Sequence, residues 1–219
     1  MTIYRHKADF RKLTIERLAQ WAKIPPAIAS DCMNRDQAMS GEISPLGEGT
    51  VLCGQAKTVN PMVADNSAMH VALEDAYPSQ VIVIAADGHL HNAVWGGLMA
   101  RAAQAQGVAG IVVDGAVRDA SEIKEIGFPC FCRNAVPAGP HKGHGGSVDA
   151  SIACGGCPVN PGDLVLGDDD GIVVVPLELE ANLLEACQKK LAAEDVVVAR
   201  INAGERLSAI QGLPKAVDI

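Results

Sequence analysis

The chain has 219 residues, 48% hydrophobic and 20% charged, so it is long enough to form one domain with a substantial core. Its net charge of −8 argues against nucleic-acid binding, which requires Lys and Arg to neutralise phosphates. The longest apolar run, 81–86, is too short to cross a bilayer, and residues 1–10 lack the apolar segment of a signal peptide. With seven irregularly spaced cysteines, we expect a cytoplasmic protein with reduced thiols and no membrane or nucleic-acid partner.

The first predicted elements are two short helices and a strand. Thr14 is a candidate cap for a helix that runs to Lys23, because apolar residues recur on one side of this segment. Proline fits the first turn of a helix but not its interior, so Pro25 and Pro26 should end this helix and start a second one at Ala27. Residues 50–59 alternate loosely between apolar and polar side chains, which predicts a strand.

The middle of the chain alternates between apolar runs and helical patterns. These patterns predict, in order, helix 68–76, strand 80–86, helix 96–106, strand 110–114, helix 120–126 and strand 129–133. Such alternation indicates an α/β fold with a largely parallel central sheet. The polar segment 87–92 follows the first of these strands, so we expect a loop at the carboxyl end of the sheet, where ligands bind in such folds.

The last third begins with a Gly-, Pro- and His-rich loop over 134–146. A hairpin follows, with strands at 163–167 and 172–175, because its Asp-Gly turn tolerates positive φ. A long helix is predicted from Leu177 to about Ala203. We therefore expect a single domain over 1–219, with an N-terminal helical arm (1–27) and a C-terminal helical tail (177–219).

A possible binding site lies where a glycine-rich segment, 95–101, enters a helix, and where Arg118 and Asp119 leave the strand that follows. Unpaired amides at a helix N-terminus suit an anion. Arginine offers a planar fork for a carboxylate, and aspartate a hard oxygen ligand for magnesium. Together they suit a small metal-chelating acid. A plainer interpretation stays open, because Asp119 and Glu122 also have the spacing of a capping box.

This spacing carries a family resemblance. Gly97, twenty intervening residues and then Arg118-Asp119, together with 160–163 and 168–176, resembles the family of the regulator of ribonuclease activity A and the divalent-metal pyruvate aldolases. The resemblance extends from about residue 28 to residue 194. Gly97 is a departure, since aldolase members often carry an acidic residue there. Asp119 favours the aldolase branch, because the ribonuclease-binding branch often replaces it.

The resemblance implies a swivelling β/β/α-type fold and a Mg²⁺- or Mn²⁺-dependent aldolase. It would cleave 4-hydroxy-4-methyl-2-oxoglutarate or 4-carboxy-4-hydroxy-2-oxoadipate, compounds of aromatic catabolism, to pyruvate and a second oxo acid. Oxaloacetate decarboxylation is expected as a side activity, and homotrimers or homohexamers as the assembly. The alternative that the resemblance leaves open is a non-catalytic regulator that binds a ribonuclease.

The resemblance also implies roles for individual residues. Asp119 would hold the metal, and Arg118 would orient the substrate and neutralise developing negative charge. Glu194 would reach the site from a neighbouring subunit as a third catalytic residue. The substrate carboxylate would bind the backbone at the helix entrance, which comprises Gly96, Gly97, Leu98 and Met99.

Four other groups of residues are weaker candidates. Buried or unreactive thiols are a better interpretation than zinc for the cysteines at 130, 132, 154 and 157, although His141 and His144 lie between them. We expect 141–144 to be a mobile solvated loop, with contact to substrate as the lesser alternative. We expect 168–170 to be a hairpin turn, not a cation site. A supporting or substrate-binding role stays open for three residues after the strand at 80–86, namely Asp87, His89 and His91.

Overall fold

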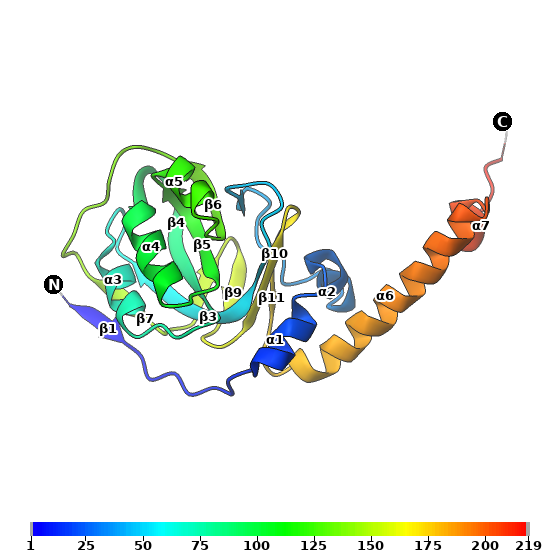
Figure 1. Cartoon of the computed structure of the whole chain (residues 1–219), viewed down its shortest axis with the longest axis horizontal. Helices are drawn as coiled ribbons and strands as arrows, with labels where there is room; N and C mark the ends of the chain where they lie inside the picture. Colours follow the sequence, from blue (N-terminus) through cyan, green and yellow to red (C-terminus); the bar gives the residue numbers. More distant parts are fainter. Residues whose placement is uncertain (1, 218–219) are drawn as a thin grey trace.

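A nine-stranded mixed sheet forms the centre of the molecule in the computed structural model, which describes residues 2–217 (Figure 1). Four of its strands are parallel neighbours: β3 (Leu52–Pro61), β4 (Gln80–Trp95), β5 (Gly110–Val117) and β6 (Cys130–Ala135). Their Val- and Ile-rich runs are buried, as expected for strands that are covered on both faces. The α/β prediction is therefore confirmed for the centre of the sheet.

Most of the remaining strands are antiparallel, so the sheet as a whole is mixed. The short strands that complete the architecture are β1 (Ile3–Arg5), β2 (Ser44–Pro45), β7 (Gly146–Val148), β8 (Ile152–Cys154), β9 (Cys157–Val159), β10 (Leu164–Asp168) and β11 (Gly171–Val175). β2 pairs antiparallel with β6, and β7 and β10 pair antiparallel with β3. β10 and β11 form the predicted hairpin, with Asp168 opposite Gly171. β8 and β9 form a separate two-stranded sheet.

Helices pack in two groups on one face of the sheet (Figure 1). The first group, α3 (Ser67–Glu74), α4 (Gly97–Ala105) and α5 (Ala120–Glu125), shares a hydrophobic core with β4 and β5. The second group, α1 (Ile15–Trp21), α2 (Pro26–Cys32) and the first turns of α6 (Glu180–Asn202), packs against β10 and β11. The opposite face of the strands forms a separate core with β8 and β9. The rest of α6 and the short α7 (Leu207–Ile210) project away from this body. Within residues 2–217, no helix is long and apolar enough to span a bilayer.

The predicted starts of the first two helices are confirmed. The Thr14 hydroxyl accepts a hydrogen bond from the Arg17 amide at 3.2 Å, as an N-cap does. Pro26 is the first residue of α2.

The predicted loop at 87–92 is wrong, because β4 continues through this segment to Trp95. Asp87 and Gly88 adopt positive φ angles of 51° and 69°, and the pairing with β5 shifts register here. Beyond this irregularity, Ala93 and Trp95 pair with Ala116 and Val117 of β5. The extended strand thus brings the glycine-rich helix entrance alongside the end of β5.

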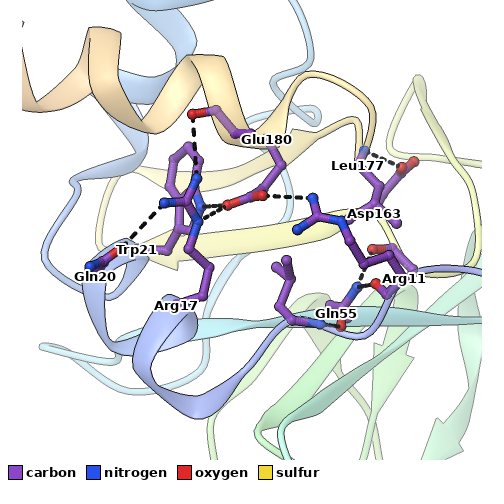
Figure 2. Close-up of polar contacts among 11 residues, drawn as sticks. Arg11, Arg17, Gln20, Trp21, Gln55, Asp163, Leu177 and Glu180 are labelled. Carbon is purple, nitrogen blue, oxygen red and sulfur yellow. Dashed lines mark hydrogen bonds and ion pairs between the residues drawn. The ribbon is translucent and has the colours of Figure 1, made fainter.

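A buried carboxylate fixes the N-terminal arm to the start of α6 (Figure 2). Glu180 is fully buried and accepts hydrogen bonds from Arg11 Nη2 at 2.8 Å, from Trp21 Nε1 at 2.6 Å and from Arg17 Nε. Burial alone would raise the pKa of Glu180, but these three donors hold the pKa below its ordinary value. The N-terminal arm and the first turn of α6 are therefore packed together.

Candidate active site

The end of β5 lies beside the helix entrance that follows β4. The Arg118 amide donates to the Trp95 carbonyl at 2.9 Å, which fixes the two chain segments side by side. Asp119 adopts a left-handed conformation, with φ 58° and ψ 37°. Its Oδ2 accepts a hydrogen bond from the Gly97 amide at 3.0 Å. The structure thus brings together the Arg-Asp pair and the glycine-rich entrance on which the sequence prediction centred.

Two glycines make room for the Arg118 side chain. A Cβ on Gly96 would lie 2.7 Å from Asp119 Oδ2 and 3.0 Å from Arg118 Cγ. A Cβ on Gly139 would lie 2.7 Å from Arg118 Nη1. Real Cβ atoms do not approach other groups this closely, so larger residues at either position would displace the arginine.

The capping-box interpretation of Asp119 and Glu122 is wrong. Asp119 occupies the N-cap position of α5, but its side chain makes no capping hydrogen bond and bonds to the neighbouring helix instead. Glu122 forms an ion pair with Arg101 Nε at 2.6 Å. Its carboxylate also fills the space that a Cβ on Gly97 would need. A carboxylate is therefore present beside Gly97, supplied by α5, and sequence reasoning missed it because its spacing matched a cap.

A cavity of about 120 Å³ opens at this junction. Its lining comprises Asn66, His70, Val94, Trp95, Gly96, Leu98, Met99, Arg118, Asp119, Pro140 and Lys142. The first-turn amides of Leu98 and Met99 have no carbonyl four residues earlier within α4, so they are available to an anion. The cavity therefore combines two cationic side chains, Arg118 and Lys142, with a helix N-terminus and one carboxylate.

Residues 141–144 are exposed, as predicted for a solvated loop, and Lys142 from this loop also lines the cavity. Lys142 Nζ donates to Asn66 Oδ1 at 3.2 Å and contacts His70 Nε2 at 3.1 Å. An ammonium group can only donate, so His70 Nε2 accepts and the ring proton lies on Nδ1. Burial and the Lys142 cation both lower the pKa of His70, which favours this neutral state.

The same loop is anchored by a buried aspartate. Asp65 is fully buried, and its Oδ2 accepts from the His144 amide at 3.0 Å and contacts His144 Nδ1 at 3.1 Å. Burial acts to raise the pKa of Asp65, but hydrogen bonds from His144 and Ser67 together lower it by more. The pKa of Asp65 is therefore below its ordinary value. Asp65 thereby holds the loop that carries Lys142 against the site. No periodic pattern predicts this contact, because the two segments are far apart in the chain.

Glu194 does not reach this cavity within its own chain. It lies on the exposed, projecting part of α6, and its nearest cation is Lys190 at 3.7 Å. α6 leaves the body on the side away from α4 and α5 (Figure 1). A Glu194 side chain could therefore act at the cavity only from another copy of the chain.

The weaker candidates lie elsewhere. Asp87, His89 and His91 are on the irregular part of β4 and do not line the cavity. Asp169 accepts from the Gly49 amide at 2.9 Å and Asp168 from the Asp170 amide at 3.0 Å, as expected of a structural turn. The cysteines are free thiols, and residues 2–217 contain no cluster of three or more His, Cys, Asp or Glu arranged to hold a metal.

The site fits a hard divalent cation that keeps most of its water. Asp119 Oδ2 is engaged by the Gly97 amide, which leaves Oδ1 without a protein donor among residues 2–217. The Asp119 side chain is 42% exposed and lines the cavity. Mg²⁺ commonly uses one or two protein carboxylates together with waters and substrate oxygens. One free carboxylate oxygen at a water-accessible cavity is compatible with that chemistry.

Comparison with known proteins identifies the family. The family model described as "RraA-like: Aldolase/RraA" matches residues 27–174. The chain belongs to the RraA-like family. It is 32% identical over 147 residues to a 4-hydroxy-4-methyl-2-oxoglutarate aldolase of Thermus thermophilus, covering 67% of this chain and 89% of that protein.

Two further RraA-like relatives extend the comparison. A Halalkalibacterium halodurans protein, provisionally named as the same aldolase, is 38% identical over 181 residues, covering 83% of this chain and 86% of that one. The solved structure of Streptomyces coelicolor RraAS2, described as an unusual member of the RNase ES inhibitor RraA family, superposes with a TM-score of 0.80 at 28% identity. That alignment covers 87% of this chain and all of RraAS2. The family thus includes proteins named as lyases and proteins named as inhibitors.

Proposed function

We propose that this chain is a divalent-metal-dependent aldolase that cleaves a 4-hydroxy-2-oxo di- or tricarboxylic acid to pyruvate and a second oxo acid. The candidates are 4-hydroxy-4-methyl-2-oxoglutarate and 4-carboxy-4-hydroxy-2-oxoadipate. The observation that carries the proposal is the convergence of Arg118, Asp119 and the α4 N-terminus on one cavity. The names of the aldolase relatives support it.

Each part of the cavity has a chemical task in this proposal. Asp119 would hold Mg²⁺ or Mn²⁺, which when bound supplies Lewis-acid polarisation of the 2-oxo group. The Leu98 and Met99 amides would bind the adjacent carboxylate. Arg118 would orient the substrate and offset the negative charge that develops as the C3–C4 bond breaks, an effect typically worth a few kcal/mol. The same charge stabilisation would decarboxylate oxaloacetate as a side activity.

Lys142 would bind the second acidic group of the substrate. It enters the same cavity from the opposite loop and is held by Asn66 and neutral His70. A cation at this place would recognise the far carboxylate of a dicarboxylic acid, because charge-assisted hydrogen bonds are about twice as strong as neutral ones. The two cationic side chains that line one small cavity support this substrate class.

The proton of the C4 hydroxyl must also be removed during cleavage. We propose that Glu194 of another copy, or a water oriented by it, takes this proton in a homotrimer or homohexamer. The exposed position of Glu194 on a helix that points away from its own cavity supports this arrangement.

A regulator that binds a ribonuclease is the second candidate function. The likeness to S. coelicolor RraAS2 favours it, because that protein is described as belonging to an inhibitor family. Such a protein would need neither a metal nor an open cavity at Arg118.

The deciding experiment compares wild type with Asp119→Asn and with Asp170→Asn, an exposed acid in the β10–β11 turn. Asn also tolerates the left-handed conformation of residue 119, so the fold should survive.

Pyruvate release from oxaloacetate and from 4-hydroxy-4-methyl-2-oxoglutarate is followed with lactate dehydrogenase, with Mg²⁺ and with EDTA. We expect EDTA or Asp119→Asn to reduce the rate at least about 100-fold, while Asp170→Asn has no effect. Full activity of Asp119→Asn would refute the assignment. A flat trace for wild type, together with pull-down of a ribonuclease, would favour the regulator.

A further inference from the structure

The joint between α2 and α6 is where the projecting helix leaves the body. Apolar residues of both helices pack in one buried cluster there, among them Ile28, Leu183 and Leu184. At the edge of the cluster, Lys190 Nζ forms an ion pair with Asp31 Oδ2 at 3.0 Å. The packing and the ion pair together fix the register of one helix against the other.

Two cysteines belong to the apolar cluster at this joint. Cys32 is the last residue of α2 and directly follows Asp31, while Cys187 lies one helical turn before Lys190 on α6. Cys187 is fully buried, and Cys32 is half-buried against the same apolar cluster. Burial, and to a lesser degree the neighbouring Cys32 thiol, raises the pKa of Cys187 to about 12.

One of the two thiols can be reached from solvent. An apolar groove of about 440 Å³ runs between the helices, lined by Cys32, Met33, Asp36, Gln37, Pro176, Leu179, Asn182, Leu183 and Ala186. Cys187 is not part of its lining. A small oxidant would therefore meet Cys32 first, while Cys187 is buried in the cluster against which Cys32 packs.

The other cysteine pairs are less suited to bonding. Cys154 and Cys157 are opposite each other across the β8–β9 turn, but their thiols donate to different groups, Ile84 O and Gln37 Oε1. Cys130 and Cys132 lie two residues apart on β6, where extended geometry separates their Cα atoms by about 6.6 Å, close to the upper limit for a disulfide. Neither thiol of that pair is more than 4% exposed.

We propose that Cys32 and Cys187 are an oxidation site that closes into a disulfide and links α2 covalently to the root of α6. With a peroxide as oxidant, the Cys32 sulfur attacks one peroxide oxygen, the O–O bond breaks, and the products are a sulfenic acid and water. The Cys187 sulfur then attacks the Cys32 sulfur, the S–O bond breaks, and a second water leaves as the disulfide forms. Two thiols are thus oxidised by two electrons, and one hydrogen peroxide is reduced to two waters. This site does not depend on the proposed lyase activity.

The test oxidises the full-length protein with a small excess of hydrogen peroxide and digests it with trypsin and Glu-C without reduction. Trypsin alone leaves Cys154, Cys157 and Cys187 on one peptide, but cleavage after Glu185 separates Cys187 from the other two. We expect a cross-linked species that joins residues 24–35 to residues 186–189, with a mass loss of about 2 Da that a dithiol reductant reverses. The oxidised protein should melt at least about 5 °C higher, because the bond closes a long loop.

Three variants make the result specific. Cys32→Ser and Cys187→Ala should lose the cross-link and the thermal shift, and circular dichroism checks that both fold. Cys53→Ser is the matched control, since Cys53 is also half-buried but is placed on β3, and this variant should behave as wild type. A different intramolecular pair, dimers linked through Cys32, or unchanged Cys32 and Cys187 thiols in the oxidised wild type would overturn the proposal.

Discussion

At the scale of single residues, the site depends on backbone conformations that few side chains tolerate. Asp119 is left-handed, which turns its carboxylate from its own helix toward the Gly97 amide. Gly96 and Gly139 leave space for the Arg118 side chain. Aspartate is among the non-glycine residues most often found in the left-handed region, so it can supply both this conformation and a ligand oxygen.

Lys142 gives the sharpest residue-scale prediction. We expect Lys142→Met to raise KM for 4-hydroxy-4-methyl-2-oxoglutarate by about 10- to 100-fold, because a hydrogen bond to a charged group contributes about 1.5–3 kcal/mol. The aldol 4-hydroxy-2-oxopentanoate lacks the second carboxylate, so its KM should change little. Steady-state kinetics on both substrates measure the difference.

Lys23→Met is the control, since Lys23 is exposed and does not line the cavity. If Lys142→Met affected both substrates equally, the role of Lys142 would be structural and the proposed second acid site would be wrong.

At the scale of elements, the sequence predicted those helix and strand boundaries that interactions between nearby residues determine. Thr14, Pro26 and the Asp-Gly turn marked element boundaries that the structure confirms, because capping, fixed φ and positive φ act within a few residues. The extension of β4 through 87–95 was missed, because its polar residues resemble a loop and its pairing depends on β5.

Long-range contacts explain the other misses. Lys142 enters the cavity only because Asp65, far away in sequence, holds its loop. Glu122 had a spacing that fits a cap, and only the packing of α4 against α5 shows its true partner, Arg101. The adjacency of Arg118, Asp119 and the glycine-rich entrance could be anticipated, because parallel strands place their carboxyl ends at one edge of the sheet.

The contact between the N-terminal arm and α6 predicts a pH-dependent stability. Glu180→Gln should lower the free energy of unfolding at pH 7 by about 3 kcal/mol, because it leaves the buried Trp21 donor and the two arginines poorly paired. The pKa of Glu180 is lowered in the folded state, so its stabilisation is present above the ordinary glutamate pKa and is lost as pH falls through the folded-state value. The difference between wild type and variant should therefore shrink below about pH 4.5.

Urea unfolding at several pH values between 3.5 and 7 measures this difference. Glu185→Gln is the matched control, because Glu185 is exposed on the same helix and forms an ion pair with nearby Lys189. We expect it to change stability little at any of these pH values. A constant gap between wild type and Glu180→Gln across the range would contradict the assigned pKa shift.

At the scale of the whole molecule, most of α6 has no packing partner within residues 2–217. Beyond its first turns it exposes apolar side chains, including Val196 (60%), Val198 (53%) and Ile201 (41%). Helices in proteins owe most of their stability to the packing of such a face. A second copy of the chain would supply that packing and would also receive Glu194, which its own cavity cannot use.

This arrangement predicts that two inactive variants restore each other. Asp119→Asn lacks the proposed metal ligand but keeps Glu194, while Glu194→Gln keeps Asp119. If Glu194 acts in a neighbouring copy, mixed oligomers contain sites that combine an intact Asp119 with an intact Glu194, about a quarter of all sites after random exchange in equal amounts. Pyruvate release should rise to that fraction of the wild-type rate once subunits are mixed, by co-expression or by mild denaturation and refolding.

A mixture of Asp119→Asn with Arg118→Ala is the matched control. Arg118 and Asp119 line one cavity of one chain, with Arg118 Nε 3.6 Å from Asp119 Oδ2. Each cavity in such a mixed oligomer therefore carries one of the two substitutions. Its activity should stay at the sum of the two variants. Native mass spectrometry shows whether the oligomers are mixed. If they are mixed and neither mixture regains activity, Glu194 does not act between subunits. A fully active Glu194→Gln would remove it from the mechanism, and the exposed face of α6 would then have only a packing role.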